Sequence, residues 1–111
     1  MKIDEQQQGA VTVLRPDGPL IEQDVPAFKE RVSRTRAASL GRFVVDMSAV
    51  PFIDSKGLEA LLDVSEELGD GGQTLRLCAA NKTVREVLEL TDLAPQFHYF
   101  DDANTAVRSF L

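Results

Sequence analysis

Segments typical of β-strands alternate with segments typical of helices along most of the chain. The strand-like runs are "AVTVL" at 10–14, "RFVVDM" at 42–47, "TLRLCA" at 74–79 and "FHYF" at 97–100. Between them, apolar residues recur every three or four positions, which is the spacing of an amphipathic helix. Strands separated by helices need crossover connections and pair mainly in parallel. The sequence therefore predicts an α/β fold with a mixed, mostly parallel central sheet and about four helices, which cover one face or both.

The first strand is followed by a turn and a short return. Asp17 and Gly18 lie at the centre of "RPDGPL", which has the composition of a turn, and Leu20 begins the return after it. An antiparallel pairing between residues 10–14 and this return strand would make the sheet mixed.

Four helices are predicted from apolar stripes and from residues that favour helix starts. Asp24 is a plausible cap for the first helix, in which Pro26 is tolerable only near the start, and Asn81 caps the third. The residues expected to face inward are Ile21, Val25, Phe28 and Val32; Leu58, Leu61, Leu62 and Leu68; Val84, Val87, Leu88 and Leu90; and Ala106, Val107 and Phe110. The later turns of the first helix carry a basic cluster that the helix dipole favours, namely Lys29, Arg31, Arg34 and Arg36.

Length and charge restrict the classes of function. A chain of 111 residues suits a single domain over 1–111, and its net charge of −6 argues against direct nucleic-acid binding. The chain opens without a signal-peptide pattern and has no apolar run of ~20 residues. We therefore expect a soluble, cytoplasmic protein without membrane insertion. The lone cysteine, Cys78, falls in a half-buried strand and is expected to be a buried, inert thiol.

No residue pattern indicates catalysis or a metal site. The single histidine, His98, has no second His or Cys close by in the sequence to help it bind a metal. "GDGG" lacks the lysine and the hydroxyl of a phosphate-binding loop. Ser55 follows Asp54, but no recognisable motif places a histidine beside them. We expect no enzyme activity, no cofactor and no metal. An enzyme that uses Ser55 is the remote hypothesis, behind the two binding functions described below.

The junction "FIDSKG" at 52–57 has two interpretations. Asp54 or Ser55 could cap the following helix by accepting hydrogen bonds from its free N–H groups. Alternatively, the Ser55 hydroxyl is a phosphorylation site. A helix N-terminus favours an anion and can accommodate a phosphate there. A phosphate brings about −1.5 to −2 charges to an acidic surface. It would repel a partner without unfolding the domain.

The longer stretch "VVDMSAVPFIDSKGLEALL" resembles the signature of the STAS domain, which is named for sulfate transporters and anti-sigma factor antagonists. The family pattern is a strand ending in Asp-x-Ser, an apolar pair, and Asp-Ser-x-Gly-Leu entering a leucine-rich helix. The matching residues here are Asp46, Ser48, Phe52, Ile53, Asp54, Ser55, Gly57 and Leu58. "PDGPL" and residues 79–107 also resemble the family, so the resemblance covers nearly the whole chain and implies a single STAS-like domain.

The resemblance implies a phosphorylation-switched anti-sigma factor antagonist. Unphosphorylated, such a protein binds an anti-sigma factor that is also a serine kinase, and a sigma factor is released. Phosphorylation of Ser55 ends the complex, and a PP2C-type phosphatase restores it. By position, Asp54 would orient the Ser55 hydroxyl and Gly57 would allow close approach of the partner. The implied partner-binding residues are Gly18, Leu20, Asp24, Asp54, Ser55, Lys56, Gly57 and Glu59.

Two further expectations concern charge. Many family members carry a second Ser or Thr after the acceptor, where this chain has Lys56, a cation that could partly neutralise a phosphate. The acids of the second helix predict a net basic docking surface on the partner; they are Glu59, Asp63, Glu66 and Glu67. The second reading is a constitutively bound STAS adaptor, in a stress-sensing complex or a lipid-transport ATPase, in which Ser55 is not a switch.

Overall fold

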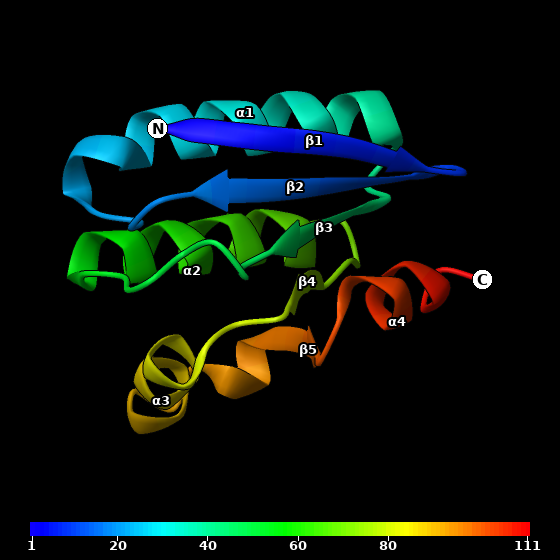
Figure 1. Ribbon diagram of the computed structural model, residues 1–111. Coiled ribbons are helices and arrows are strands. Elements are labelled where there is room, and N and C mark those ends of the chain that lie inside the picture. The colour runs from blue at the N-terminus through cyan, green and yellow to red at the C-terminus, as the bar shows by residue number, and fades with distance from the viewer.

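The computed structural model describes residues 1–111, apart from the side chain of Ala94, and contains one five-stranded sheet with helices against it (Figure 1). The strands are β1 (Lys2–Gln8), β2 (Val11–Asp17), β3 (Phe43–Asp46), β4 (Leu75–Cys78) and β5 (Phe97–Phe100). The helices are α1 (Val25–Ser39), α2 (Ser55–Asp70), α3 (Lys82–Leu90) and α4 (Ala103–Arg108), with 3-10 turns η1 (Glu22–Asp24) and η2 (Ala94–Gln96). The strands lie in sequence order, β1 antiparallel to β2 and the others parallel. The predicted mixed, mostly parallel α/β fold is confirmed.

The prediction for the N-terminal hairpin was wrong in its turn and its partner strand. Residues 10–14 do lie largely in β2, but β2 continues to Asp17 and pairs with β1, which precedes it. The chain reverses at Gly9, whose φ of +62° suits glycine, and not at Asp17-Gly18. The sequence hid β1 because "KIDEQQQ" is a mostly exposed edge strand with little apolar content. Leu20 forms only an isolated parallel bridge with Ile53.

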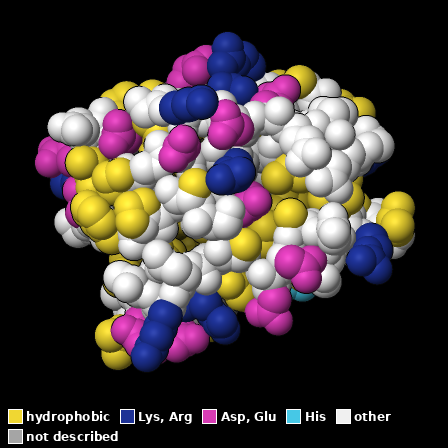
Figure 2. Space-filling model, viewed as in Figure 1, with side chains coloured by type: hydrophobic (Ala, Val, Ile, Leu, Met, Phe, Trp, Pro, Cys, Tyr) yellow, Lys and Arg dark blue, Asp and Glu magenta, His cyan; other side chains and the backbone are white. Residues whose placement is uncertain are grey.

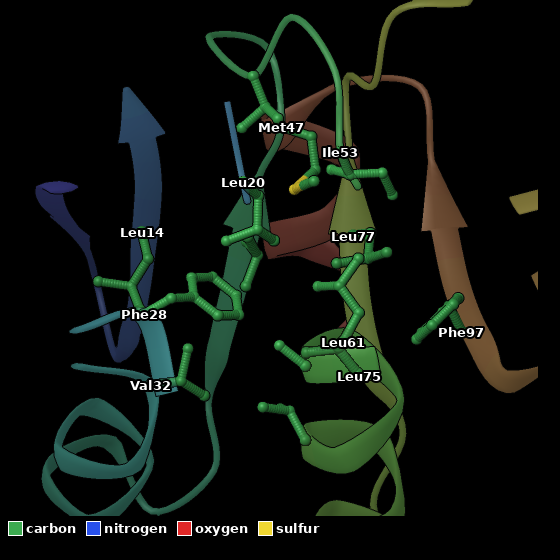
Figure 3. Packing of buried hydrophobic residues seen from close by; sticks show 14 of the residues in the cluster. Leu14, Leu20, Phe28, Val32, Met47, Ile53, Leu61, Leu75, Leu77 and Phe97 are labelled. Atoms are coloured by element: carbon green, nitrogen blue, oxygen red, sulfur yellow. The ribbon is translucent and has the colours of Figure 1, made fainter. Parts of the chain in front are cut away.

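Helices cover both faces of the sheet, which answers the question that the periodicity left open. Phe43 and Val45 belong to a large cluster with side chains from α1, α2 and α3. Val44, between them, belongs to a smaller cluster with Ala106 of α4. Figure 3 shows part of the large cluster, in which Phe28 of α1 and Leu61 of α2 lie among strand residues. Alternate residues of one short strand thus serve two cores.

Cys78 joins the smaller cluster and is fully buried, as its place in β4 predicted. Burial, and to a smaller extent the carboxylates of Asp46 and Asp102, raise the pKa of its thiol to about 12. The thiol is therefore protonated at neutral pH, which is the state of an unreactive cysteine.

Two details of the helices differ from the predictions. Asp24 stands at the N-cap position of α1 but makes no side-chain capping hydrogen bond, since its carboxylate instead lies 3.6 Å from the amino group of Met1. Leu90 was expected to face inward, yet its side chain is 84% exposed. It follows the buried Leu88 by two residues, which is roughly 200° around a helix. Asn81 and Pro26 take the predicted places at helix starts.

The basic cluster of α1 has partners that the helix dipole does not explain. Only Arg36 lies in the last turn, where its guanidinium donates to the carbonyl oxygen of Glu67 at 3.3 Å. Lys29 Nζ lies 2.9 Å from a carboxylate oxygen of Asp63 in α2. Arg31 pairs with Glu5 of β1 at 3.3 Å. The cluster therefore ties α1 to both of its neighbours.

Among the described residues, no helix is long and apolar enough to cross a membrane.

Candidate functional site

The junction between β3 and α2 places Ser55 at the exposed start of a helix. Asp54 is the N-cap: its Oδ1 accepts a hydrogen bond from the Gly57 N–H at 2.8 Å. Ser55 is the first helical residue, and its side chain is exposed. Of the two candidate caps, the structure therefore selects Asp54, which leaves the Ser55 hydroxyl at the surface.

A second set of hydrogen bonds joins this junction to the segment before α1. Asp54 Oδ2 accepts from the Glu22 N–H at 2.9 Å, and the Asp54 N–H donates to the Leu20 carbonyl at 3.2 Å. The Leu20 N–H donates in turn to the Phe52 carbonyl at 3.1 Å. Residues 20–22 and 52–54 are thus held together along their backbones. The two carboxylate oxygens of Asp54 orient this backbone, where we had expected them to orient the Ser55 hydroxyl.

Gly57 is required by contact inside the chain. It is buried, and a Cβ atom added to it would lie only 2.2 Å from the Leu20 carbonyl oxygen. The first turn of α2 can therefore approach residue 20 only because Gly57 has no side chain. The lack of a side chain at Gly57 thus serves a contact with Leu20 inside the chain, and a contact of Gly57 with a partner stays a prediction.

The loop above the sheet rests on buried side chains. Leu20 and Met47 are fully buried and Ile53 is 8% exposed; Figure 3 shows the three together beyond the end of β3. Leu20 was expected to contact a partner, but its side chain faces this floor and not solvent. The side-chain amide of Asn81, the N-cap of α3, donates to the Pro51 carbonyl at 3.0 Å. The loop that precedes Ser55 is therefore held in place by these buried side chains and by the hydrogen bond from Asn81.

The remaining expected residues lie at the same end of the molecule. Gly18 is half-buried and donates its N–H to the Ala49 carbonyl at 3.0 Å, and Asp24 is half-buried. Lys56 and Glu59 are exposed and form an ion pair at 3.2 Å. The positive charge beside Ser55 is thus already shared with an acid of the same helix.

Phe52 is a surface residue that the sequence did not assign to the site. Its side chain is 47% exposed, whereas its neighbour Ile53 is buried. Two consecutive apolar residues in an extended segment point to opposite sides, so one of the pair had to face outward. Figure 2 shows hydrophobic side chains gathered over the end of the molecule where α2 begins. An apolar surface of this kind beside Ser55 suits a protein contact.

The carboxyl group of Asp54 is held in its ionised form. The N–H of Gly57 and then that of Glu22 lower its pKa, because both donate to the carboxylate. Its folded-state pKa is thus below the unfolded value of about 4. The stability that Asp54 contributes is complete above about pH 5 and is lost as the pH falls through the folded pKa.

We expect this pH dependence to be measurable. In Asp54→Asn, stability should vary less between pH 5 and pH 2 than in the wild type, because the linked proton uptake is removed. Urea unfolding at several pH values would measure it. Asp70→Asn removes the same charge at the far end of α2 and is the control. An unchanged slope in Asp54→Asn would contradict the assigned role.

Asn81 provides a second test of the anchored loop. Its Oδ1 accepts from the Val84 N–H at 2.8 Å, while its amide holds the Pro51 carbonyl. Asn81→Ala should lower the free energy of unfolding by about 1–2 kcal/mol, since a cap and a loop contact are both lost. Asn81→Asp keeps the capping oxygen but has no amide donor, so the difference between the variants isolates the loop contact. Equal stability of Asn81→Ala and wild type would refute this anchoring.

A mixed five-stranded sheet with helices on both faces and an Asp-Ser-x-Gly junction at the start of α2 together characterise this small α/β domain. The chain belongs to the STAS domain family, whose family model matches residues 2–106.

Solved structures with the same fold include several anti-sigma factor antagonists. One assigned to that class from Thermotoga maritima has a TM-score of 0.87 and 22% identity, with 96% of this chain and 92% of the other covered. One from Mycobacterium paratuberculosis has a TM-score of 0.83 and 24% identity, with 97% and 92% covered. The Bacillus cell-fate determinant SpoIIAA, in its phosphorylated form, has a TM-score of 0.72 and 20% identity, with 99% and 100% covered. At these identities the similarity establishes the fold.

Proposed function

We propose that this protein is a phosphorylation-switched binding module, an anti-sigma factor antagonist whose docking surface surrounds Ser55. The observation that carries the proposal is an exposed serine at a helix start whose backbone is fixed by Asp54, Gly57 and Leu20. A surface that is already ordered loses little conformational freedom on binding. The exposed Phe52 supplies an apolar anchor next to it.

A phosphate on Ser55 would change the charge of this surface and leave the fold in place. The hydroxyl is exposed, and the N-terminus of α2 favours a negative charge. The ionised Asp54 carboxylate is adjacent, and Lys56 is already paired with Glu59. The helix N-terminus and Lys56, whose charge is partly offset by Glu59, would therefore balance only part of the added charge, and the rest would have to be desolvated or would repel an acidic group in a complex.

The proposed partner is an anti-sigma factor that is also a serine kinase, and a PP2C-type phosphatase would reverse the modification. The exposed Glu59, Glu66 and Glu67 of α2 favour a basic docking surface on the partner. Asp63 is paired with Lys29 and Glu59 with Lys56, so these two acids add less to this acidic surface than Glu66 and Glu67 do.

A paired capture experiment tests the function. Ser55→Ala and Ser55→Asp baits would be incubated with extract of the source organism, and bound proteins identified by mass spectrometry. Ser33→Asp, an exposed serine in α1, controls for added charge elsewhere. We expect a kinase-like ATPase with Ser55→Ala and Ser33→Asp only. Recovery of the same proteins by both Ser55 baits would favour the constitutive adaptor and contradict the switch.

Phe52 should contribute strongly to binding. Phe52→Ala should weaken the complex about 30-fold, which corresponds to ~2 kcal/mol, because buried aromatic anchors dominate interfaces. Leu90→Ala removes a side chain that is more exposed and lies on α3, so it should leave affinity unchanged. Isothermal titration calorimetry with the captured partner would measure both. An affinity of Phe52→Ala within threefold of wild type would place the contact elsewhere.

A further inference from the structure

A surface cleft lies at the end of the sheet opposite Ser55. It is a cleft of about 620 Å³ between the β1–β2 hairpin and the C-terminal half of α1. Ser55 follows the C-terminal end of β3, whereas the cleft is lined by Thr12 near the start of β2 and by Arg42 just before β3. In Figure 1 the hairpin turn and the end of α1 lie at one side of the molecule, and the start of α2 lies at the other.

The cleft concentrates positive charge in an acidic protein. Arg31, Arg34 and Arg42 line it together with a single acid, Glu5, although the chain as a whole carries a net charge of −6. Arg31 is held by Glu5 at 3.3 Å. Arg34 approaches Glu30 at 3.7 Å, but both side chains are about two-thirds exposed, and such a pair contributes little. Arg34 and Arg42 are therefore the guanidinium groups that a ligand could engage.

The rest of the lining is mostly polar, with Ala10, Ala38 and Leu40 as its apolar members. Thr12 and Thr35 are nearly buried in it, at 6% and 5% exposure. The Thr12 hydroxyl donates to Gln7 Oε1 at 2.9 Å, and the Ser39 hydroxyl donates to the Thr35 carbonyl at 2.7 Å. These hydrogen bonds occupy the Thr12 and Ser39 hydroxyls, and the charged donors left for a ligand are the arginines. The volume is that of a small-molecule site.

We propose that this cleft binds a small phosphate-bearing anion. Guanidinium groups form paired hydrogen bonds that match the oxygens of phosphate, and two of them at one cleft favour a ligand with more than one anionic oxygen pair. The mostly polar lining disfavours an apolar ligand. The site is separate from the docking surface around Ser55, so it stands or falls independently of the proposed function.

Inorganic pyrophosphate is the probe that tests the proposal. In ¹⁵N-correlation NMR of the full chain, we expect saturable shifts at the amides of Thr12, Ser39 and Arg42, with Kd below ~1 mM. The amides of Ser55 to Gly57 should not shift. The double variant Arg34→Gln/Arg42→Gln should bind at least tenfold more weakly. Arg15→Gln/Arg108→Gln removes the same charge from exposed positions outside the cleft and should bind as the wild type does.

Several results would overturn the proposal. The first is that no amide shifts saturably up to ~10 mM pyrophosphate. The second is that both double variants lose affinity equally. The third is that the shifts are centred on the start of α2. Citrate tests whether any multiply charged carboxylate binds equally well. If citrate bound as tightly as pyrophosphate, the preference for phosphate would be refuted. Shifts caused by poly-glutamate but not by pyrophosphate would indicate an acidic protein partner instead.

Discussion

Ser55→Asp is expected to weaken binding of the anti-sigma partner by about 100-fold or more. The side chain is exposed at the first position of α2, so the new carboxylate meets the partner and not the core. It would lie beside the ionised Asp54 and near Glu59, whose charge is shared with Lys56. A loss of ~3 kcal/mol corresponds to a factor of ~150, which is the size expected when a charge is desolvated without a partner at an interface.

The same variant should remain folded, and this separates a switch from a structural defect. Asp is tolerated in the first turn of a helix, where the dipole favours it. Denaturant unfolding should therefore give Ser55→Asp a stability close to that of the wild type. Ser33→Asp is the matched control for binding, because it adds the same charge on α1. If Ser55→Asp lost stability as well as affinity, the weaker binding would be due to misfolding and not to the added charge.

Gly57→Ala is expected to be strongly destabilising. Its Cβ would lie 2.2 Å from the Leu20 carbonyl oxygen and 3.0 Å from the carbonyl carbon. Both atoms belong to backbone that is hydrogen-bonded to Phe52 and Asp54, so a side-chain rotation cannot relieve the contact. We expect the free energy of unfolding to fall by about 3 kcal/mol, at the upper end of the cost of overpacking.

Gly69→Ala in the same helix is the control for Gly57→Ala. An added Cβ there meets nothing within 4 Å. Alanine also favours helix over glycine, so this variant should gain about 0.5–1 kcal/mol. Chemical denaturation followed by circular dichroism would compare the two. If Gly57→Ala were as stable as Gly69→Ala, the close approach of Leu20 to α2 would be refuted.

The sequence predicted those parts of the fold that depend on local patterns. Apolar spacing located four strands and four helices because alternation and helical periodicity are local properties. It missed β1, whose polar residues form an edge strand only because β2 is available to pair with them. It also misplaced Leu90, since the stripe of α3 was extended past the point where rotation around the helix carries it outward.

The candidate site was predicted in part for the same reason. The Asp-Ser junction and the N-cap were recognisable because capping involves residues within three positions of each other. The hydrogen bond from Glu22 to Asp54 spans 32 residues, and the burial of Leu20 against Gly57 depends on the folded sheet. Local patterns therefore could not separate residues that are buried beneath the surface, such as Leu20 and Gly57, from residues that are exposed on it.

The most direct test of the central claim is the affinity of the captured partner for the protein before and after stoichiometric phosphorylation of Ser55. Isothermal titration calorimetry on the two forms, with the fold checked by circular dichroism, would provide it. We predict that phosphorylation weakens binding by at least ~100-fold while the spectrum stays unchanged. Equal affinity of the two forms would contradict the charge switch and leave Asp54-Ser55 as a helix start in a constitutive adaptor.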